Sequence, residues 1–88
     1  MTTINYRAEI FPEGDLYVAQ CPELDVSSFG DAVDEARDSL QEAVEAFLEG
    51  CEMLDTLDAV LEESGFSKVN GTWRLGRRIV EEATATIP

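Results

Sequence analysis

The stretch YVAQCPELDVSSFGDAVDEA, Tyr17 to Ala36, runs from an apolar segment through a proline-containing break into an acidic segment with helical spacing. Proline has no amide hydrogen to donate to a sheet, so Pro22 predicts the end of a strand that begins at Leu16. The β-prone run from Val26 to Phe29 predicts another short strand, and Gly30-Asp31 marks the change to helix. We expect the distinctive residues of this passage to build a fold and a docking surface rather than a reaction centre.

A period-2 alternation precedes this stretch and predicts one strand with a single buried face. The turn-forming residues from Pro12 to Asp15 would join that strand to the next one in a hairpin. The expected buried positions of the first strand are Ile4, Tyr6, Ala8 and Ile10.

The clearest predicted element is an amphipathic helix. Apolar residues follow at helical spacing from Val33 to Leu48, and Gly50 is expected to end the run. We expect Asp31 to be the N-cap, with Asp34 and Glu35 complementing the positive end of the helix. The opposite face of this helix is strongly acidic.

The remaining residues predict a short helix, a hairpin and a last strand. Asp55 is expected to cap the second helix and Gly65 to end it in a left-handed conformation. Asn70-Gly71 is a strong signal for a two-residue hairpin turn. Alternation from Glu82 to Ile87 predicts the last strand.

Length and element order together predict one α+β domain covering residues 1–88. Its core would lie in residues 4–50, and residues 51–88 would add the short helix, the hairpin and the last strand. The expected architecture is an antiparallel sheet of three to four strands with one long and one short helix on one face.

The charge of the chain is strongly negative and unevenly distributed. Nineteen acids against six bases give a formal net charge of −13. Residues 1–66 hold 17 acids and 2 bases, a net −15, whereas residues 67–88 hold 4 bases and 2 acids, a net +2. Such a surface repels nucleic-acid phosphates and attracts basic proteins. Adaptation to high salt would produce the same composition, and the two explanations are compatible.

The residue types for common catalytic and metal sites are scarce. The chain has no histidine, which removes the usual general base and the commonest metal ligand. Cys21 and Cys51 are expected to be reduced packing residues, since neither has a neighbouring cation in the sequence. We therefore expect no catalytic residue, no cofactor and no metal. The acids that a metal-dependent nuclease could use, by a less favoured interpretation, are Glu9, Glu23, Asp25 and Asp31.

A single basic cluster lies near the C-terminus, comprising Lys68, Arg74, Arg77 and Arg78 around Trp73. An aromatic ring among arginines suits stacking on single-stranded RNA or contact with an acidic partner. The alternative, which we favour, is that Trp73 fills the core while its neighbours are solvated.

The sequence contains no apolar run near the roughly 20 residues that span a bilayer. Its N-terminus lacks the basic and apolar segments of a signal peptide. We expect a cytoplasmic protein.

The stretch that opens the fold resembles the HicB family of antitoxins. The resemblance lies in Tyr17–Leu24 (YVAQCPEL), in Gly30-Asp31 and in Asp34–Ala36 (DEA), and covers about residues 4–50. Two positions depart from the family pattern. Ala32 replaces the threonine that usually follows Gly-Asp, and Asp25-Val26 stands where Pro-Gly is usual.

The resemblance implies a partial RNase-H-like fold without nuclease activity. Relatives bind and block a small basic toxin of the HicA type, which cleaves mRNA. Many also repress their own operon through a C-terminal DNA-binding segment. Residues 51–88 do not predict two helices around a tight turn, so DNA binding is not carried over. Leu61–Phe66 resembles a helix end of the toxins, but a chain without histidine lacks their catalytic residue.

The expected partner-binding residues lie mainly on the acidic helix face. They are Asp34, Asp38, Glu42 and Glu45, with Trp73 and Arg74 as further candidates. An orphan binding or regulatory domain without a toxin is the alternative function. In either case we expect a homodimer or a higher homo-oligomer.

Overall fold

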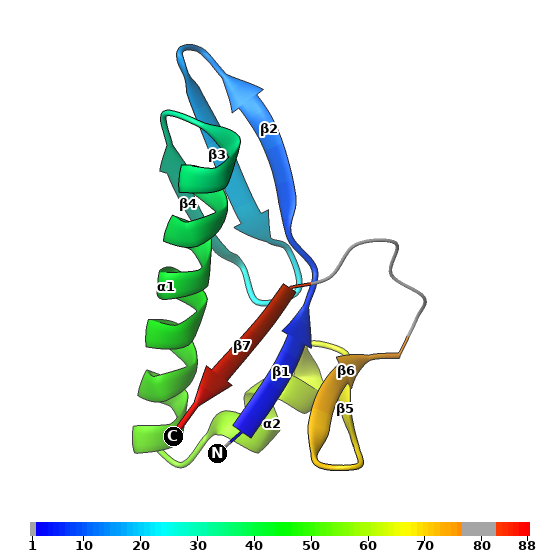
Figure 1. The fold of residues 1–88 in the computed structure, drawn as a ribbon. Coiled ribbons are helices and arrows are strands. Elements are labelled where there is room, and N and C mark those ends of the chain that lie inside the picture. The colour runs from blue at the N-terminus through cyan, green and yellow to red at the C-terminus, as the bar shows by residue number, and fades with distance from the viewer. Residues whose placement is uncertain (1, 77–82) are drawn as a thin grey trace.

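The computed structural model describes residues 2–76 and 83–88 of the chain (Figure 1). The fold is α+β, as predicted. The described elements, in chain order, are β1 (Thr2–Tyr6), β2 (Glu9–Glu13), β3 (Leu16–Cys21), β4 (Val26–Gly30), α1 (Val33–Met53), α2 (Leu57–Glu63), β5 (Phe66–Val69), β6 (Thr72–Leu75) and β7 (Ala83–Ile87).

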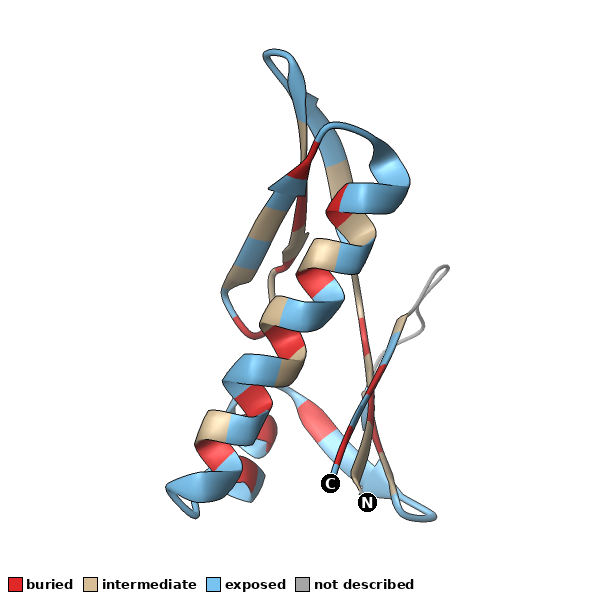
Figure 2. Ribbon diagram, turned by 60° about the vertical axis from the view of Figure 1, so that its left-hand side comes forward, coloured by how far each residue is buried: buried red, intermediate tan, exposed pale blue. Residues whose placement is uncertain are grey.

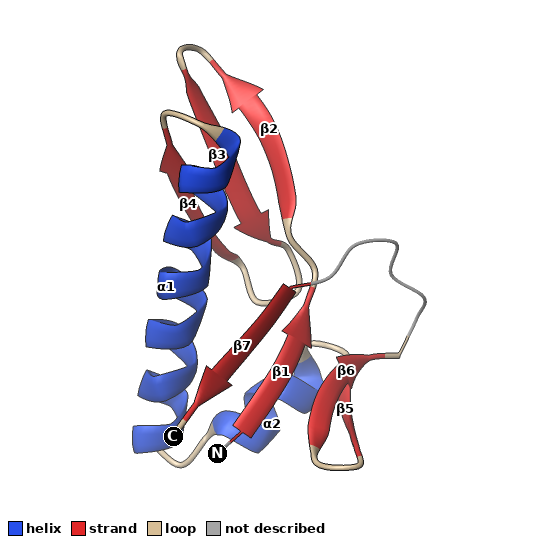
Figure 3. Ribbon diagram, viewed as in Figure 1, coloured by secondary structure: helices blue, strands red, loops and turns tan. Residues whose placement is uncertain are grey.

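The strands form two sheets rather than the single antiparallel sheet that we expected (Figure 3). One sheet has the order β5-β6-β1-β7 and the other has the order β2-β3-β4. In the first sheet β1 runs parallel to β6 and antiparallel to β7, while all other pairs are antiparallel.

The predicted first strand is divided at Arg7-Ala8, where the chain passes from one sheet into the other. Ile4 and Tyr6 pair with β7, whereas Ile10 pairs with β3. The apolar alternation continues through the division, since Ile4 and Tyr6 are buried and Ala8 and Ile10 are half-buried. The sequence pattern therefore does not reveal where the strand changes partners.

The predicted passage from β3 to β4 is confirmed. Pro22 follows the last residue of β3, and the amide of Asp25 donates a 3.3 Å hydrogen bond to the carbonyl oxygen of Pro22. Asp25 adopts a φ of 56°, a left-handed conformation that aspartate tolerates better than most residues. It thereby closes the turn between β3 and β4.

The first helix begins one residue later than expected. Its N-cap is Ala32, whose extended backbone (φ −138°, ψ 162°) fits a cap although its side chain makes no capping hydrogen bond. The prediction that Asp31 caps the helix is therefore wrong, because Asp31 lies one position outside the cap. Asp34 and Glu35 do lie in the first turn, as predicted.

The same helix continues past Gly50 and ends at Met53. Asp55 takes a φ of 59°, the amide of Thr56 donates to the carbonyl of Cys51 at 2.8 Å, and the Asp55 amide donates to Glu52 at 3.1 Å. This pair of bonds is a Schellman ending, with Asp55 in the left-handed position that glycine usually occupies. Asp55 is consequently not the cap of α2, which is Thr56.

Apart from the cap of α2, the local predictions for the C-terminal half are confirmed where the residues are described. Gly65 ends α2 with a φ of 96°, and Asn70 and Gly71 form the β5–β6 turn with φ values of 51° and 82°. In β7 the side chains of Ala85 and Ile87 are buried. The expected start of this strand at Glu82 lies outside the described residues.

The hydrophobic core lies between α1 and the strands that it crosses (Figure 2). The long helix packs against β3 and β4 of one sheet and β7 of the other, while α2 packs against β5. Its buried residues form one stripe, comprising Ala36, Leu40, Val44, Leu48 and Cys51. Neither helix in residues 2–76 and 83–88 combines the length and apolar character that a bilayer crossing requires.

Candidate partner-binding surface

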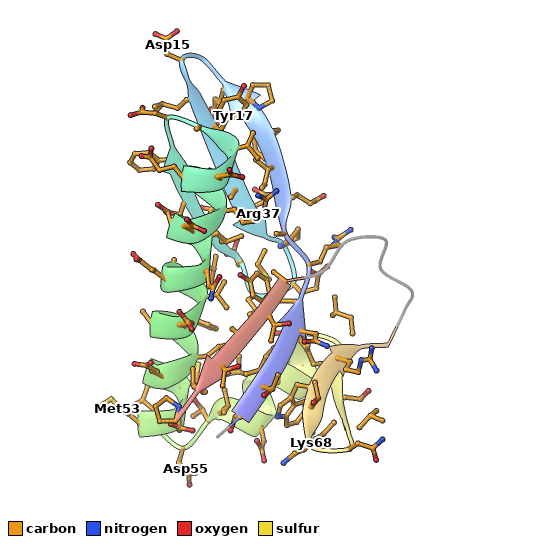
Figure 4. The ribbon with its side chains drawn as sticks, viewed as in Figure 1. Asp15, Tyr17, Arg37, Met53, Asp55 and Lys68 are labelled. Carbon is orange, nitrogen blue, oxygen red and sulfur yellow. The ribbon has the colours of Figure 1, made fainter. Side chains whose placement is uncertain are left out.

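The free side of α1 is a carboxylate-rich surface. The helix carries seven acids and a single base, Arg37. Among the predicted partner-binding residues, Asp34, Asp38 and Glu42 are all exposed. Figure 4 shows acidic side chains projecting from the helix along its length. The structure therefore brings most of the predicted acidic set onto one rigid and accessible face.

Glu45 differs from the other predicted acids. It is half-buried. Burial, followed by the charges of Cys21 and Glu45, raises the pKa of Tyr6 in β1 to about 12. The negative charge of Glu45 therefore contributes to the raised pKa of the Tyr6 phenol in β1. Glu45 lies at the border of the free face of α1 rather than at its centre. The exposed Glu49, one turn further along, lies closer to that centre.

The negative charge is least compensated in the second half of α1. Arg37 donates a 2.9 Å hydrogen bond to Asp34, and their side chains are 41% and 91% exposed. This pair partly neutralises the first turns. The middle and last turns carry Glu42, Glu49 and Glu52, and no base lies on these turns.

Two exposed apolar residues follow these carboxylates. Met53 is 87% exposed and Leu54 is 76% exposed, which is unusual for large apolar side chains that stand side by side. Met53 lies one turn beyond Glu49 and so extends the same free face (Figure 4). The sequence analysis missed this pair because Gly50 was expected to end the helix.

Trp73 and Arg74 do not join the acidic surface. Trp73 is only 3% exposed and lies beside Ile4 in the sheet, so its ring is a core residue, as the favoured interpretation held, and is not available to a partner. Arg74 is exposed. Their strand, β6, is separated from α1 by β1 and β7. Arg77 and Arg78 of the predicted basic cluster lie outside the described residues.

The residues of the Cys-Pro-Glu-Leu turn have structural roles. Arg7 donates a 2.9 Å hydrogen bond to Glu23, whose side chain is 7% exposed, and this ion pair links the junction of the two sheets to the β3–β4 turn. Leu24 is buried. Cys21 is fully buried, and burial raises its pKa to about 11, which disfavours the reactive thiolate at neutral pH.

The described residues do not assemble a metal site. Within residues 2–76 and 83–88, no three acidic or cysteine side chains are placed to share a metal ion. Of the acids considered for a nuclease, Glu23 is held by Arg7. A pocket of about 230 Å³ lies between Ile10, Tyr17 and Arg37, and a second of about 440 Å³ lies between Thr2, Glu52 and Leu57.

Comparisons with protein families, curated proteins and solved structures find no match for this chain. What the surface can do therefore follows from its own residues. A helix rich in carboxylates with an apolar end provides electrostatic attraction and a small anchor for a basic protein, without offering a reactive group.

Proposed function

We propose that this chain is an HicB-like antitoxin that binds and blocks a small basic, mRNA-cleaving toxin of the HicA type in the cytoplasm. The free face of α1 is its docking surface, and the chain has no catalytic activity of its own. The observation that carries the proposal is the concentration of exposed carboxylates on α1, where seven acids stand against one base.

The geometry of α1 suits competition with RNA. Its 21 residues extend over about 30 Å, and its exposed acids occupy one continuous side. An RNA-cleaving enzyme must bind phosphates through basic side chains, and a row of carboxylates can occupy the same side chains. The negative charge would accelerate encounter, while Met53 and Leu54 would slow dissociation by burying apolar area.

The fold adds support of a different kind. The antiparallel β2-β3-β4 sheet, the long helix after it and the parallel β1–β6 pair are compatible with the partial RNase-H-like fold of the HicB family. The proposal does not include DNA binding, because α2 is followed by a hairpin and not by a second helix.

The test is a binding titration with the basic protein encoded in the adjoining reading frame, its catalytic histidine replaced. Reversing two charges on α1, with Asp38→Lys and Glu42→Lys, should weaken binding at least tenfold. The matched control reverses two exposed acids on α2, with Asp58→Lys and Glu62→Lys, which changes the net charge equally. That control should bind within about twofold of the wild type at physiological salt.

Equal weakening by both pairs would show that only net charge matters and would overturn the assignment of the α1 surface. Unchanged binding of both variants would do the same. A neighbouring frame that encodes no basic chain would overturn the antitoxin proposal. It would favour the alternative, an orphan oligomeric binding domain, for which the apolar sheet face described next is the supporting observation.

A further inference from the structure

The sheet β2-β3-β4 has an apolar face that no described element covers. Directly paired residues share a face of an antiparallel sheet, and the register places Phe11 beside Val18 and Val18 beside Phe29. These three residues form a row across all the strands. Phe11 is 40% exposed and Phe29 is 63% exposed.

This row lies on the side of the sheet turned away from α1. The residues that face the helix are the alternate ones, among them Ala19, Cys21 and Gly30, and all three are buried. In residues 2–76 and 83–88, α1 is the element outside this sheet that packs extensively against it. Figure 1 shows the helix on one side of these strands only.

The corresponding face of the other sheet is chemically different. On the side away from its buried residues, β1 and β7 present Thr3, Asn5, Thr84 and Thr86, and the Thr84 hydroxyl donates to the Asn5 side chain at 2.9 Å. These are the small polar residues expected on a solvated sheet face. The outer faces of the two sheets therefore differ in polarity. The row that contains Phe11 and Phe29 on the outer face of β2-β3-β4 indicates a contact surface.

We propose that this face, centred on Phe29, binds a second copy of the same chain. The argument is electrostatic. Two copies with a formal charge of −13 each repel one another wherever acids meet, so contact through uncharged residues favours their association. The outward residues of β3 and β4 carry no charge, being Leu16, Val18, Gln20, Ser27 and Phe29.

Other occupants fit this surface less well. Exposed aromatic rings on a sheet can stack on single-stranded RNA, but Glu9 and Glu13 flank Phe11 on the same face and would repel phosphates. A basic protein would be drawn instead to the carboxylates of α1. These lie on the side of the helix that is turned away from the sheet, and the helix itself is about 10 Å thick. A second copy is the partner for which the absence of charge on β3 and β4 is an advantage, with Glu9 and Glu13 of β2 at the border of the contact.

The dimensions predict a weak dimer. Three strands about 4.8 Å apart and five residues long give a footprint of roughly 14 by 17 Å, or on the order of 240 Å² per copy. This is about a third of the roughly 800 Å² per partner in a standard stable interface. We therefore expect dissociation at micromolar or higher concentration, and a dimer that is strengthened by salt because salt screens the repulsion.

The test is sedimentation of the whole chain from about 1 µM to about 1 mM protein, at about 0.2 M and about 2 M sodium chloride. The wild type should shift to dimer within this range, and at lower concentration in the higher salt. Phe29→Thr, and separately Phe11→Thr, should raise the dissociation constant at least tenfold. The control is Val69→Thr, which removes an apolar side chain 48% exposed at the edge of the other sheet and should leave dimerisation unchanged.

Circular dichroism and thermal unfolding establish that each variant is folded, and Phe11→Thr provides a second measurement if Phe29→Thr is unstable. A wild type that stays monomeric at the highest concentration in both salts would overturn the proposal. So would equal effects of Phe29→Thr and Val69→Thr, or RNA binding that is lost in Phe29→Thr. The salt dependence also separates this proposal from the antitoxin function, because salt weakens a complex with a basic protein.

Discussion

Gly30 at the end of β4 lies directly against the backbone of Ala36 in the first turns of α1. A Cβ atom at position 30 would be 2.6 Å from the amide nitrogen of Ala36, and 2.8 Å from the carbonyl carbon of Glu35. Backbone atoms cannot move aside as a flexible side chain can. The glycine of the Gly30-Asp31 pair therefore sets how closely the helix approaches the sheet.

Gly30→Ala should destabilise the protein by about 2 kcal/mol or more, because the helix must move outward and open the core around Ala36. Gly50→Ala is the matched control, since a Cβ atom at position 50 of the same helix meets nothing within 4 Å. That control should stabilise by about 0.5–1 kcal/mol through helix propensity. Urea unfolding measures both, and a Gly30→Ala protein as stable as the wild type would refute the close approach.

Two ion pairs of equal length should differ in their contribution to stability. Arg7–Glu23 and Arg37–Asp34 both measure 2.9 Å, but the acid side chain is 7% exposed in the first pair and 91% exposed in the second. Arg7→Ala should cost about 2 kcal/mol because it leaves a carboxylate in a nearly dry site. Arg37→Ala should cost less than about 0.5 kcal/mol. Equal losses in denaturant unfolding would contradict this interpretation.

The N-terminus of α1 offers a stabilising substitution. Ala32 has the backbone conformation of an N-cap without a side chain that can accept a hydrogen bond. Ala32→Ser should raise the free energy of unfolding by about 1 kcal/mol, because its hydroxyl can accept a bond from an unpaired amide of the first turn. Asp31→Ala serves as the control and should change stability by less than about 0.5 kcal/mol. A larger loss at Asp31 would identify that residue as the functional cap after all.

Stability should fall in alkaline solution. Burial raises the pKa of Cys21 from 9.0 to about 11, and the pKa of Tyr6 from 10.0 to about 12. Between the unfolded and folded pKa values the native state holds more protons than the unfolded state, so stability decreases as pH rises. The contribution of the thiol is complete below pH 9 and is lost as pH rises towards 11.

Unfolding in urea from pH 8 to pH 10 should show a loss of roughly 1 kcal/mol from the thiol. Cys21→Ala, although less stable at every pH, should show a shallower decline over this interval. A decline equally steep in Cys21→Ala would assign the effect to other groups.

Local chemistry was readable from the sequence wherever one or two residues fix the backbone. Pro22 ended β3, Asn70-Gly71 turned the β5–β6 hairpin, and Gly65 stopped α2, because each restricts or permits particular dihedral angles whatever surrounds it. The acidic stripe of α1 was likewise predictable, since helical periodicity alone places those residues on one side.

The capping residues were harder to predict. Asp31 and Asp55 have good capping side chains, yet the caps are Ala32 and Thr56. Gly30 lies in close contact with Glu35 and Ala36 near the N-cap of α1, and Asp55 takes part in the Schellman ending of that helix. These are contacts between elements and turns, and propensity does not encode them.

By itself, then, the sequence determined the secondary elements, the negative charge and its distribution along α1, because each depends on neighbours in the chain. The division of one alternating strand between two sheets at Arg7-Ala8, the burial of Trp73 and the exposure of Phe29 were decided by the tertiary structure. All three depend on which distant strand or helix covers a given face. A period-2 pattern shows that two faces differ, but only the packing of the whole chain selects the face that stays open.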